Sequence, residues 1–585
     1  MLRLPLTLVL LCISSVLPYC GSDSAPDLVF YNGTIITMAE SRQLQNPEAV
    51  LVQDGKIKFL GSSEQVFEKA GPDFRKVDLK GATLLPGFVA PHTHPELSAY
   101  LHTFVDLSGF SHSSPESVMN ALRKAVSEAK PGQWIYCKGF DPILVAGLRK
   151  PHISELDAIA PNNPVVILAQ SMHSAWANSL AFEELGITAD TEAPEKGSYY
   201  EVDDQGNLTG FIAEVAAMQP FVKAALPTID IKDNFQGVLD GYAANGITSI
   251  GTAGLFGEDD KPLMLMRWLS AEEPGLLLRI LGALGILPER KPSVRNFVYL
   301  KANSPFELPA APDRTDPSFQ IVGIKLWYDG SPYTGSMYLS EPYIDSSLMQ
   351  DGLGLQPGTT GSPVQTREEF QSQVRKFHDQ GWQIAVHSQG DQSSLDVMEV
   401  LESVLKESPR SDHRHRIEHA LLLPTELLPE LSIEGVTVSF HINHLYYYGV
   451  ALKQDIIGDR ADSMLPARST AANGIRFTLH ADQPMYPAEP LSLIQTAVDR
   501  TTREGTVLGE SESITVERAL KALTIDGAWQ LGMEDSLGSI EPGKYADLVI
   551  LDRNPKSTPI SEIRSIKVLG SFVSGTQISG QPYFE

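Results

Sequence analysis

Apolar and polar positions follow one rhythm at both ends of the chain and another in the middle. From 27 to 85, short apolar runs alternate with Asn-Gly, Asp-Gly and Lys-Gly turns, and the same texture returns over 535–585. Runs of this kind predict short β-strands joined by tight turns. We therefore expect 27–85 and 535–585 to form one composite β-domain, a β-sandwich that flanks a central domain.

Between these ends, over 86–534, strand-like apolar segments alternate with helical ones such as 368–381. Alternation of this type predicts an α/β fold with a parallel sheet and covering helices. The leading architecture is a (β/α)8 TIM-like barrel. The eight predicted strands are 87–94, 246–254, 276–285, 321–330, 382–391, 414–422, 436–444 and 476–484.

One stretch is too long for a loop of such a barrel. Residues 96–236 separate the first predicted strand from the second, whereas a connection within a barrel is usually much shorter. We expect an inserted subdomain there, placed as a lid over the mouth of the barrel.

Alternating positions within the strands predict which side chains enter the barrel, since successive residues face opposite sides. The outward sets are Trp382, Ile384 and Val386; Val322, Ile324 and Leu326; and Phe477, Leu479 and Ala481. The inward sets contain Gln383, Ala385 and His387; Lys325; and Thr478, His480 and Asp482. In 414–419 the same count turns Arg416 and Glu418 outward, where they would pair with each other. Polar groups thus gather at the C-terminal mouth, where such barrels place active sites.

His92-Thr93-His94 is the sharpest local signal in the chain. Two histidines at i and i+2 of a strand project to one side, where both imidazoles can bind one cation. His413 and His415 have the same spacing, so the spacing alone is weak evidence. The context strengthens it, because Lys325, His387, His419 and Asp482 stand at the ends of four other predicted strands.

Composition narrows the classes of function. The 46 basic and 72 acidic residues give a net charge of −26, which repels nucleic acid and anionic lipid. Three cysteines without a CxxC pair form neither a disulfide framework nor a zinc finger. We expect no nucleic-acid partner, and a metal held by histidine, carboxylate or modified lysine.

The N-terminus reads as a targeting segment. Arg3 precedes an uncharged apolar stretch, 4–17, that suits a signal peptide and is too short for a membrane span. Residues 1–20 are therefore predicted to be a signal peptide or, with Cys20 lipidated, a lipoprotein signal. The expected location is outside the cytoplasm: periplasmic, tethered to a membrane, or secreted. No second apolar run reaches membrane length.

Several ordered motifs together resemble a known family. LLPGFVAPHTH, His387 and His419 at successive strand ends, Asp482 in HADQP and the closing GSIEPGKYADLVILD resemble the amidohydrolase superfamily of metal-dependent hydrolases. WIYCKGFD, HSAWANS, IKLWYDGS and HRIEHALLLPTEL are similar to its branch that includes N-substituted formamide deformylases. The chain departs from that branch at His480-Ala481, where Gly-Ser is usual, and at His441-Ile442, where Gln-Pro is common.

The resemblance implies a set of metal ligands. His92, His94 and Asp482 would bind one divalent cation, and His387 with His419 a second, with Zn²⁺ the expected ion for such donors. Lys325 would be N-carboxylated and bridge the two ions. The alternative is an unmodified lysine in a salt bridge and a site for one ion.

A metal-activated hydroxide is the expected nucleophile. Asp482 would accept its proton and pass it to the leaving amine, with His419 and His444 the next candidates for that transfer. His444 would stabilise the oxyanion, unless it is an exposed loop residue. The predicted substrate contacts are His173, Trp176, Asn178, Glu214 and His444, and the alternative for the members in 96–236 is packing within the subdomain.

The expected activity is hydrolysis of a carbon–nitrogen bond in a small-molecule amide or N-formyl or N-acyl amine. Since related sites also perform deamination and ester or lactone hydrolysis, those reactions remain open. A catalytically inactive binding protein is the alternative from another class, and it would lack at least one ligand, whereas all of the expected ligands are present. The oligomeric state is left open.

Overall fold

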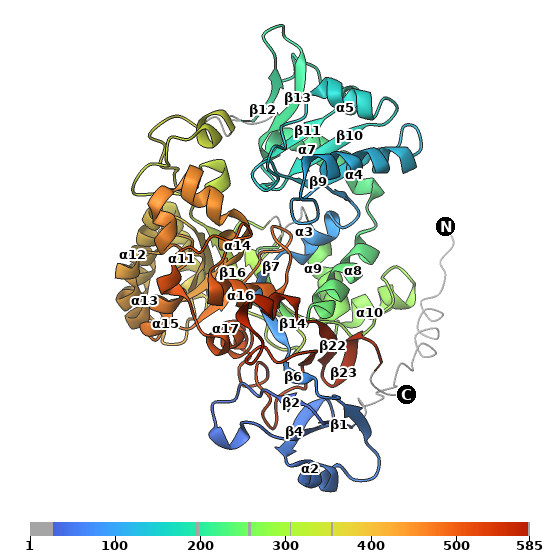
Figure 1. Ribbon diagram of the computed structural model, residues 1–585, viewed down its shortest axis with the longest axis vertical. Helices are drawn as coiled ribbons and strands as arrows, with labels where there is room; N and C mark the ends of the chain where they lie inside the picture. Colours follow the sequence, from blue (N-terminus) through green and yellow to red (C-terminus); the bar gives the residue numbers. More distant parts are fainter. Residues whose placement is uncertain (1–26, 193–197, 256–258, 305, 353–354, 583–585) are drawn as a thin grey trace, which may run out of the picture.

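The computed structural model describes residues 27–192, 198–255, 259–304, 306–352 and 355–582. The predicted leader 1–20, with Cys20, lies outside these residues. Three parts follow one another along the long axis of the molecule, with the β-domain of the chain ends at one end, the barrel in the middle and the inserted subdomain at the other end (Figure 1).

The central sheet has eight parallel strands in the order β20-β19-β18-β17-β16-β15-β14-β7. The strands are β7 Phe88–Thr93, β14 Ile247–Ala253, β15 Arg295–Lys301, β16 Phe319–Trp327, β17 Gln383–Ser388, β18 Arg416–His419, β19 Thr437–Phe440 and β20 Phe477–Leu479. The edge strands β7 and β20 lie side by side, and His94 N donates to the carbonyl of Gln483 at 2.8 Å across the seam. The predicted barrel is confirmed.

The third predicted strand is wrong. Residues 276–285 contain helix α10, Leu276–Ala283, and the third strand of the sheet is β15. A short apolar run does not by itself distinguish a strand from a helix, and Leu and Ala favour the helix. Leu276 and Leu277 of α10 are 76% and 62% exposed, so this run is a surface element rather than a buried strand.

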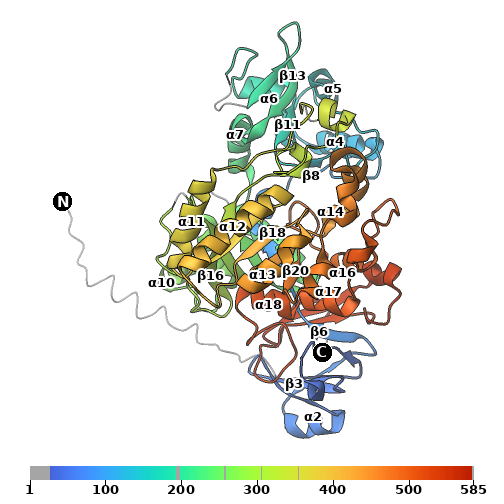
Figure 2. The same ribbon diagram turned by 90° about the vertical axis from the view of Figure 1, so that its left-hand side faces the viewer.

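Helices lie around the outside of the barrel, most of them following a strand (Figure 2). They are α3 Pro95–Tyr100, α8 Ile231–Ala244, α9 Lys261–Ser270, α11 Arg367–Asp379, α12 Asp391–Glu407, α13 Leu428–Glu434, α14 Asn443–Ala451, α15 Ala467–Ala472, α16 Pro490–Asp499 and α17 Val516–Ala522. A further helix, α18 Ile525–Leu531, lies at one end of the barrel. The buried outward residues Ile324, Ile384 and Phe477 belong to the large core that includes residues of these helices, as the parity of the strands predicts.

An apolar plug fills the N-terminal end of the barrel. Val89, Tyr299 and Ala385 from inside the barrel pack with Ala528 and Leu531 of α18. Val322 joins this plug, so its predicted outward position is wrong. The register shifts where Val298 pairs with Ile321 and Tyr299 with Gly323; Val322 is thus an extra residue, a β-bulge, which reverses the alternation. Because this end is closed, the open end is the C-terminal mouth.

Strands from both chain ends make the flanking β-domain. The sheet β4-β3-β1-β5 contains Lys56–Gly61, Ala49–Gln53, Leu28–Tyr31 and Arg75–Asp78, with α2 Ser63–Ala70 beside it. The sheet β2-β6-β21-β22-β23 contains Thr34–Ile35, Thr83–Pro86, Leu548–Leu551, Val568–Val573 and Thr576–Gly580. Phe30 and Phe572 meet edge to face at 5.3 Å in the core that both sheets share.

The segment between β7 and β14 folds as a separate layer. Its sheet, β12-β13-β11-β10-β9-β8, contains Tyr199–Val202, Leu208–Ala213, Ser174–Ala177, Val165–Ala169, Ile135–Phe140 and Val105–Asp106. Its helices are α4 Pro115–Glu128, α5 Ile153–Ile159, α6 Ser179–Glu184 and α7 Glu214–Ala225. Gln170 Nε2 donates to the carbonyl of Met485 at 2.6 Å and Arg503 Nη1 to that of Gly109 at 3.0 Å. The layer therefore lies against loops at the C-terminal mouth of the barrel.

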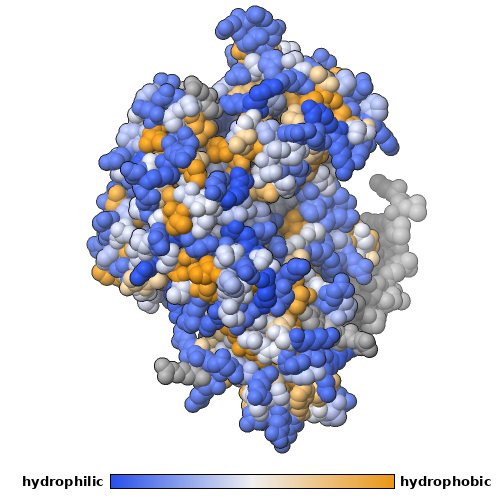
Figure 3. Space-filling model, viewed as in Figure 1, coloured by the Kyte–Doolittle hydropathy of each residue, from blue (hydrophilic) through white to orange (hydrophobic). Residues whose placement is uncertain are grey.

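The visible surface is mostly hydrophilic, with apolar residues in separate patches (Figure 3). Among the described residues, no helix has both the length and the apolar character needed to cross a membrane.

Candidate metal centre

The two histidines that end β7 converge on one carboxylate. Asp482 Oδ1 lies 3.1 Å from His92 Nε2 and 3.0 Å from His94 Nε2. All three side chains are buried, with residue exposures of 1%, 7% and 8% for His92, His94 and Asp482. Burial alone would raise the pKa of Asp482, but the neighbouring His92 and His94 hold it well below the usual value. The carboxylate is therefore an anion facing two imidazoles, as expected for a shared cation site.

Two of the predicted ligands lie at breaks in regular strand geometry. His419 has φ +73° and Asp482 has φ +54°. Both values lie in the left-handed region of backbone conformation, which residues other than glycine seldom adopt. At His419 this conformation interrupts the alternation of β18. Glu418 and His419 are consecutive, yet Glu418 bonds to His92 and the ring of His419 lies 4.9 Å from that of His92. Strain of this kind is common at functional sites.

His387 and Lys325 come from neighbouring strands. The rings of His387 and His419 are 4.2 Å apart, and burial lowers the pKa of His387 to about 3, which leaves it neutral. Lys325 is 1% exposed and its Nζ has no hydrogen-bond partner among the described residues. That nitrogen lies 5.3 Å from the centre of the Trp327 ring. Burial lowers the pKa of Lys325 to about 8.

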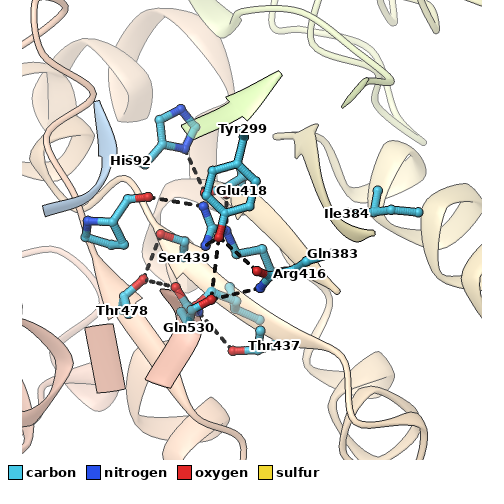
Figure 4. Close-up of polar contacts among 12 residues, drawn as sticks. His92, Tyr299, Gln383, Ile384, Arg416, Glu418, Thr437, Ser439, Thr478 and Gln530 are labelled. Atoms are coloured by element: carbon cyan, nitrogen blue, oxygen red, sulfur yellow. Dashed lines mark hydrogen bonds and ion pairs between the residues drawn. The ribbon is translucent and has the colours of Figure 1, made fainter. Parts of the chain in front are cut away.

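A buried charged network supports His92 from below (Figure 4). Glu418 Oε2 lies 2.7 Å from His92 Nδ1 and accepts a hydrogen bond from it, and Arg416 donates to the other carboxylate oxygen. Arg416 also donates to Tyr299 Oη at 2.9 Å and to the carbonyl of Pro91 at 3.1 Å. A carboxylate behind a histidine fixes its tautomer and leaves Nε2 as the ligand atom.

The predicted outward direction of Arg416 and Glu418 is therefore wrong, although they do pair with each other. Both are fully buried inside the barrel, while Ile417 belongs to the outer core. The count from His419 was misleading because His419 departs from the extended conformation. The HRIEH motif indicated the inward direction of Arg416 and Glu418. Two opposite charges next to a predicted ligand histidine are stable in a buried position only when they pair with each other and with other polar groups.

Two further histidines enter the same space. His441 follows β19 and His480 follows β20, and they are 2% and 1% exposed. The His480 ring stacks on that of His92 at 4.5 Å, with an angle of 7° between the planes. The inward position of His480 agrees with the strand parity. His480-Ala481-Asp482 repeats the i, i+2 spacing of His92-Thr93-His94, and this was the available signal for a ligand role.

His444 lies buried in a wall of tyrosines at the start of α14. Its Nδ1 is 2.6 Å from Tyr333 Oη and 2.8 Å from Tyr486 Oη, and burial lowers its pKa to about 3. Neutral Nδ1 accepts from these hydroxyls, so Nε2 carries the proton and is available as a donor. The alternative, an exposed loop residue, is excluded because His444 is 3% exposed.

The tyrosine wall continues to the inserted subdomain through Asp141. Tyr448 Oη donates to Asp141 Oδ2 at 2.5 Å, and Tyr448 packs on Tyr333 with ring centres 4.2 Å apart. Burial raises the pKa of Asp141. Sequence reasoning missed this contact, since residues more than 300 positions apart form it.

The residues predicted to bind substrate from the subdomain lie elsewhere. Trp176 is 2% exposed and packs on Phe140 at 5.0 Å. Asn178 Oδ1 accepts from Val165 N at 2.9 Å and caps α6. Both build the core of the subdomain, which corrects their assignment to the pocket. His173 Nδ1 and Glu214 Oε2 are 3.0 Å apart, with side chains 42% and 51% exposed, so they pair with each other at the surface.

The donors at the mouth suit a divalent metal. One ligand atom each from His92, His419 and Asp482 lies within 4.8 Å of the others, and the same holds for His419, His441 and His480. His419 Nε2 and Asp482 Oδ1 are buried without a conventional hydrogen-bond partner among the described residues. Imidazole nitrogen with carboxylate oxygen is the donor set of Zn²⁺ and similar ions, and a cation here would satisfy these buried atoms.

Comparison with known proteins finds relatives over nearly the whole chain. The N-substituted formamide deformylase of Arthrobacter pascens is 27% identical over 565 residues, which cover 94% of this chain and 97% of that protein. Protein LONG AFTER FAR-RED 3 of Arabidopsis thaliana is 26% identical over 569 residues, 94% of this chain and 91% of that protein.

A crystal structure of an uncharacterized metal-dependent hydrolase from Pyrococcus horikoshii has the same fold, with a TM-score of 0.67 at 23% identity, covering 92% of this chain and 99% of that one. The family model described as the amidohydrolase family matches residues 75–583. The chain belongs to the amidohydrolase family.

Proposed function

We propose that this protein hydrolyses a carbon–nitrogen bond of a small-molecule amide, an N-formyl or N-acyl amine. Membership of the family implies a divalent metal. The observation that carries the proposal is the position of Asp482 Oδ1, about equally far from His92 Nε2 and His94 Nε2 at the open mouth of the barrel. One carboxylate thus serves both as a ligand and as a proton acceptor beside the reacting groups.

The chain supplies the remaining roles through its own side chains. A divalent ion bound here would act as a Lewis acid toward the carbonyl and would lower the pKa of water. Asp482, held as an anion, accepts the proton of the attacking water and returns it to the leaving nitrogen. His444, with Nε2 as its donor, faces the same mouth and is placed to stabilise the negative oxygen. The tyrosine side chains beside His444 would contact the acyl or amine group of the substrate.

We further propose Zn²⁺ as the ion, with Lys325 carboxylated when two ions bind. The lowered pKa of Lys325 supports this, since at about 8 a useful fraction of its amine is neutral at physiological pH. The neutral amine adds to carbon dioxide, forming an N–C bond and releasing one proton to give an anionic carbamate. Lys325→Ala is expected to lower metal content, with partial recovery when a short carboxylic acid is added.

The substrate class is tested with a panel of N-formyl and N-acyl amines, matched amino-substituted heterocycles, and esters and lactones. The wild-type protein is compared before metal removal, after chelation and after restoring Zn²⁺. The proposal expects amine release from the amides, lost on chelation and regained with metal. Ammonia release from the heterocycles alone would establish a deaminase instead, and metal binding without turnover of any member would favour a binding protein.

We also propose export of the mature protein, directed by residues 1–20. The apolar stretch after Arg3 supports this location. In a bacterial host, mass spectrometry of the mature chain is expected to show loss of the leader, and a diacylglyceryl adduct on Cys20 would identify the tethered form. Recovery of the unprocessed chain from the cytoplasm would contradict export.

A further inference from the structure

We propose that His419, His441 and His480 form a three-imidazole site for a divalent transition metal, in addition to the site of His92, His94 and Asp482. The three residues stand at the ends of the adjacent strands β18, β19 and β20. One ring nitrogen from each lies within 4.8 Å of the others. Rigid neighbouring strands thus present three neutral nitrogen donors to one point.

The tautomer of His441 leaves a lone pair directed at this point. Its Nε2 is 3.2 Å from the carbonyl of Ala481, which can only accept, so Nε2 carries the proton. In the neutral ring Nδ1 then carries the lone pair, and it lies within hydrogen-bond distance of Nδ1 of His419, at 3.3 Å. An ion bound by both nitrogens would replace that hydrogen bond. A carbonyl behind a ligand histidine is a common way to orient it.

His480 is difficult to explain by packing alone. Neither of its ring nitrogens has a hydrogen-bond partner among the described residues, and the side chain is 1% exposed. A buried polar atom left unsatisfied costs about 1–3 kcal/mol. A phenyl ring would stack on His92 equally well without that cost. A cation bound by one of these nitrogens would give it a partner.

The surrounding carboxylates favour a cation at His480. Glu418 offers a carboxylate oxygen within 4.8 Å of a ring nitrogen of His480, and the carboxylate of Asp482 stands two residues further along the chain. Zn²⁺ takes three imidazoles with a fourth position left for water or substrate, and Co²⁺, Ni²⁺ and Cu²⁺ also accept imidazole ligands.

His419 is also a predicted ligand of the ion at His387, and it belongs to a set with His92 and Asp482. A neutral imidazole has one lone pair, so His419 binds one ion at a time. Binding at the three-imidazole site therefore competes with these other uses of His419 and leaves His92, His94 and Asp482 available. A variant that removes only His94 should leave the three-imidazole site intact, whereas removal of His480 or His441 should leave the His92, His94 and Asp482 set intact.

The direct test uses crystals of the wild-type protein soaked with Zn²⁺ or Co²⁺. An anomalous difference peak is expected within about 2.0–2.1 Å of ring nitrogens of His419, His441 and His480. At saturating metal, peaks confined to the other ligands would overturn the proposal. Because the wild-type chain is used, this measurement does not depend on the folding of any variant.

Metal affinity of the purified apoprotein provides the second test, by competition with a chromophoric chelator. His480→Phe and His441→Phe keep a buried ring and remove the donors, and each is expected to weaken the binding of one Zn²⁺ equivalent by at least about tenfold. His444→Phe is the matched control at the same mouth and should keep the wild-type stoichiometry, and His94→Phe should keep one equivalent.

Wild-type stoichiometry and affinity in both folded His480→Phe and His441→Phe would refute the site. The readouts are metal position and metal affinity. They therefore stand or fall separately from the proposed amide hydrolysis, whose failure would appear as metal-loaded protein without amine release.

Discussion

At the scale of single residues, the chemistry depends on which side chains are charged inside the barrel. Asp482 is held as an anion by His92 and His94, so its carboxylate carries no proton. His387 and His444, with pKa values lowered to about 3 by burial, stay neutral. Burial and neighbouring charge, rather than residue type, thus set the charge states on which the proposed ligand, acceptor and donor roles depend.

Asp482→Asn tests the proton-transfer role. Asn has nearly the same shape but does not accept a proton, so turnover should fall by at least about two orders of magnitude while the fold is retained. The measurement is kcat of the metal-loaded protein on a hydrolysed amide, with the pH–rate profile, whose acidic limb should change. Exposed Asp535→Asn is the control and should be unaffected. Near-normal turnover in Asp482→Asn would move the proton shuttle to His419 or His444.

Glu418→Gln tests the support of His92. The substitution leaves the buried guanidinium of Arg416 without its anion, which costs about 3–5 kcal/mol of stability, and loosens the orientation of His92, which weakens metal binding by about 10–100-fold. Urea unfolding and competition with a chelator measure the two effects. Exposed Glu426→Gln on the following loop should change stability by less than about 0.5 kcal/mol. Unchanged metal affinity would show that Glu418 is structural only.

Glu418 should also make the stability of the protein depend on pH. Burial would raise the pKa of Glu418, but Arg416 and His92 hold it well below its usual value. The contribution of Glu418 to the free energy of unfolding is therefore fully present above the unfolded-state pKa of about 4.3. It is lost as the pH falls through the pKa of the folded state. Wild-type stability should drop as the pH is lowered below about 4.3, and in Glu418→Gln the drop should be smaller. Parallel curves for the two proteins would contradict this assignment.

At the scale of elements, α18 closes the barrel by a polar contact as well as by its apolar plug. Gln530 Nε2 donates to Thr437 Oγ1 at 3.0 Å and to the carbonyl of Val438 at 2.9 Å, and its Oε1 accepts from Thr478 at 2.8 Å (Figure 4). One side chain thus joins α18 to β19 and β20. These strands also precede His441 and His480, so the plug helps to fix the mouth.

Gln530→Leu keeps the volume and removes these bonds. Buried groups of β19 and β20 then lose partners, and unfolding free energy should fall by about 1–3 kcal/mol for each group left unsatisfied. Thermal and urea unfolding measure the change. Exposed Gln380→Leu at the C-terminal end of α11 is the control, with an expected change of less than about 0.5 kcal/mol. A loss in Gln530→Leu no larger than the control would show that water replaces these bonds.

At the scale of the whole molecule, the flanking β-domain is joined to the barrel by a buried ion pair. Arg295 at the start of β15 donates to Asp547 at 2.7 Å from Nε and at 3.0 Å from Nη2. Arg295 is 0% and Asp547 6% exposed. Since β6 leads directly into β7, and β6 pairs with β21, the two chain ends and the first ligand strand form one connected unit.

Asp547→Ala should weaken this unit. It leaves the buried charge of Arg295 with its neutral hydrogen-bond partners and with half-exposed Glu272, whose carboxylate is 3.8 Å away. The loss of the close anion should cost about 3–5 kcal/mol. Differential scanning calorimetry is expected to show a lower transition temperature. The double variant Arg295→Met with Asp547→Leu, which removes both charges, should recover part of the loss. If the double variant is no better than Asp547→Ala, packing rather than the buried charge sets the cost.

Local patterns were sufficient for those features that depend on neighbours in the chain. Two-residue alternation placed His92 and His94 on one side of a strand, and it placed Lys325, His387 and Asp482 at strand ends, because the pleat of a strand imposes this period. Turn residues at both chain ends likewise indicated the short strands of the β-domain. These predictions needed no knowledge of distant contacts.

Other features depend on the tertiary structure, because local backbone geometry or a partner far away in the sequence overrides the two-residue alternation of a strand. The left-handed conformation of His419 let Glu418 enter the barrel, and a bulge turned Val322 inward. The run at 276–285 formed a surface helix, since neither a strand nor a helix is specified by so short an apolar segment. His419, His441 and His480 converge because β18, β19 and β20 pair side by side in the sheet. Closure of the barrel then brings His92 of β7 against His480. No single stretch of sequence contains these contacts.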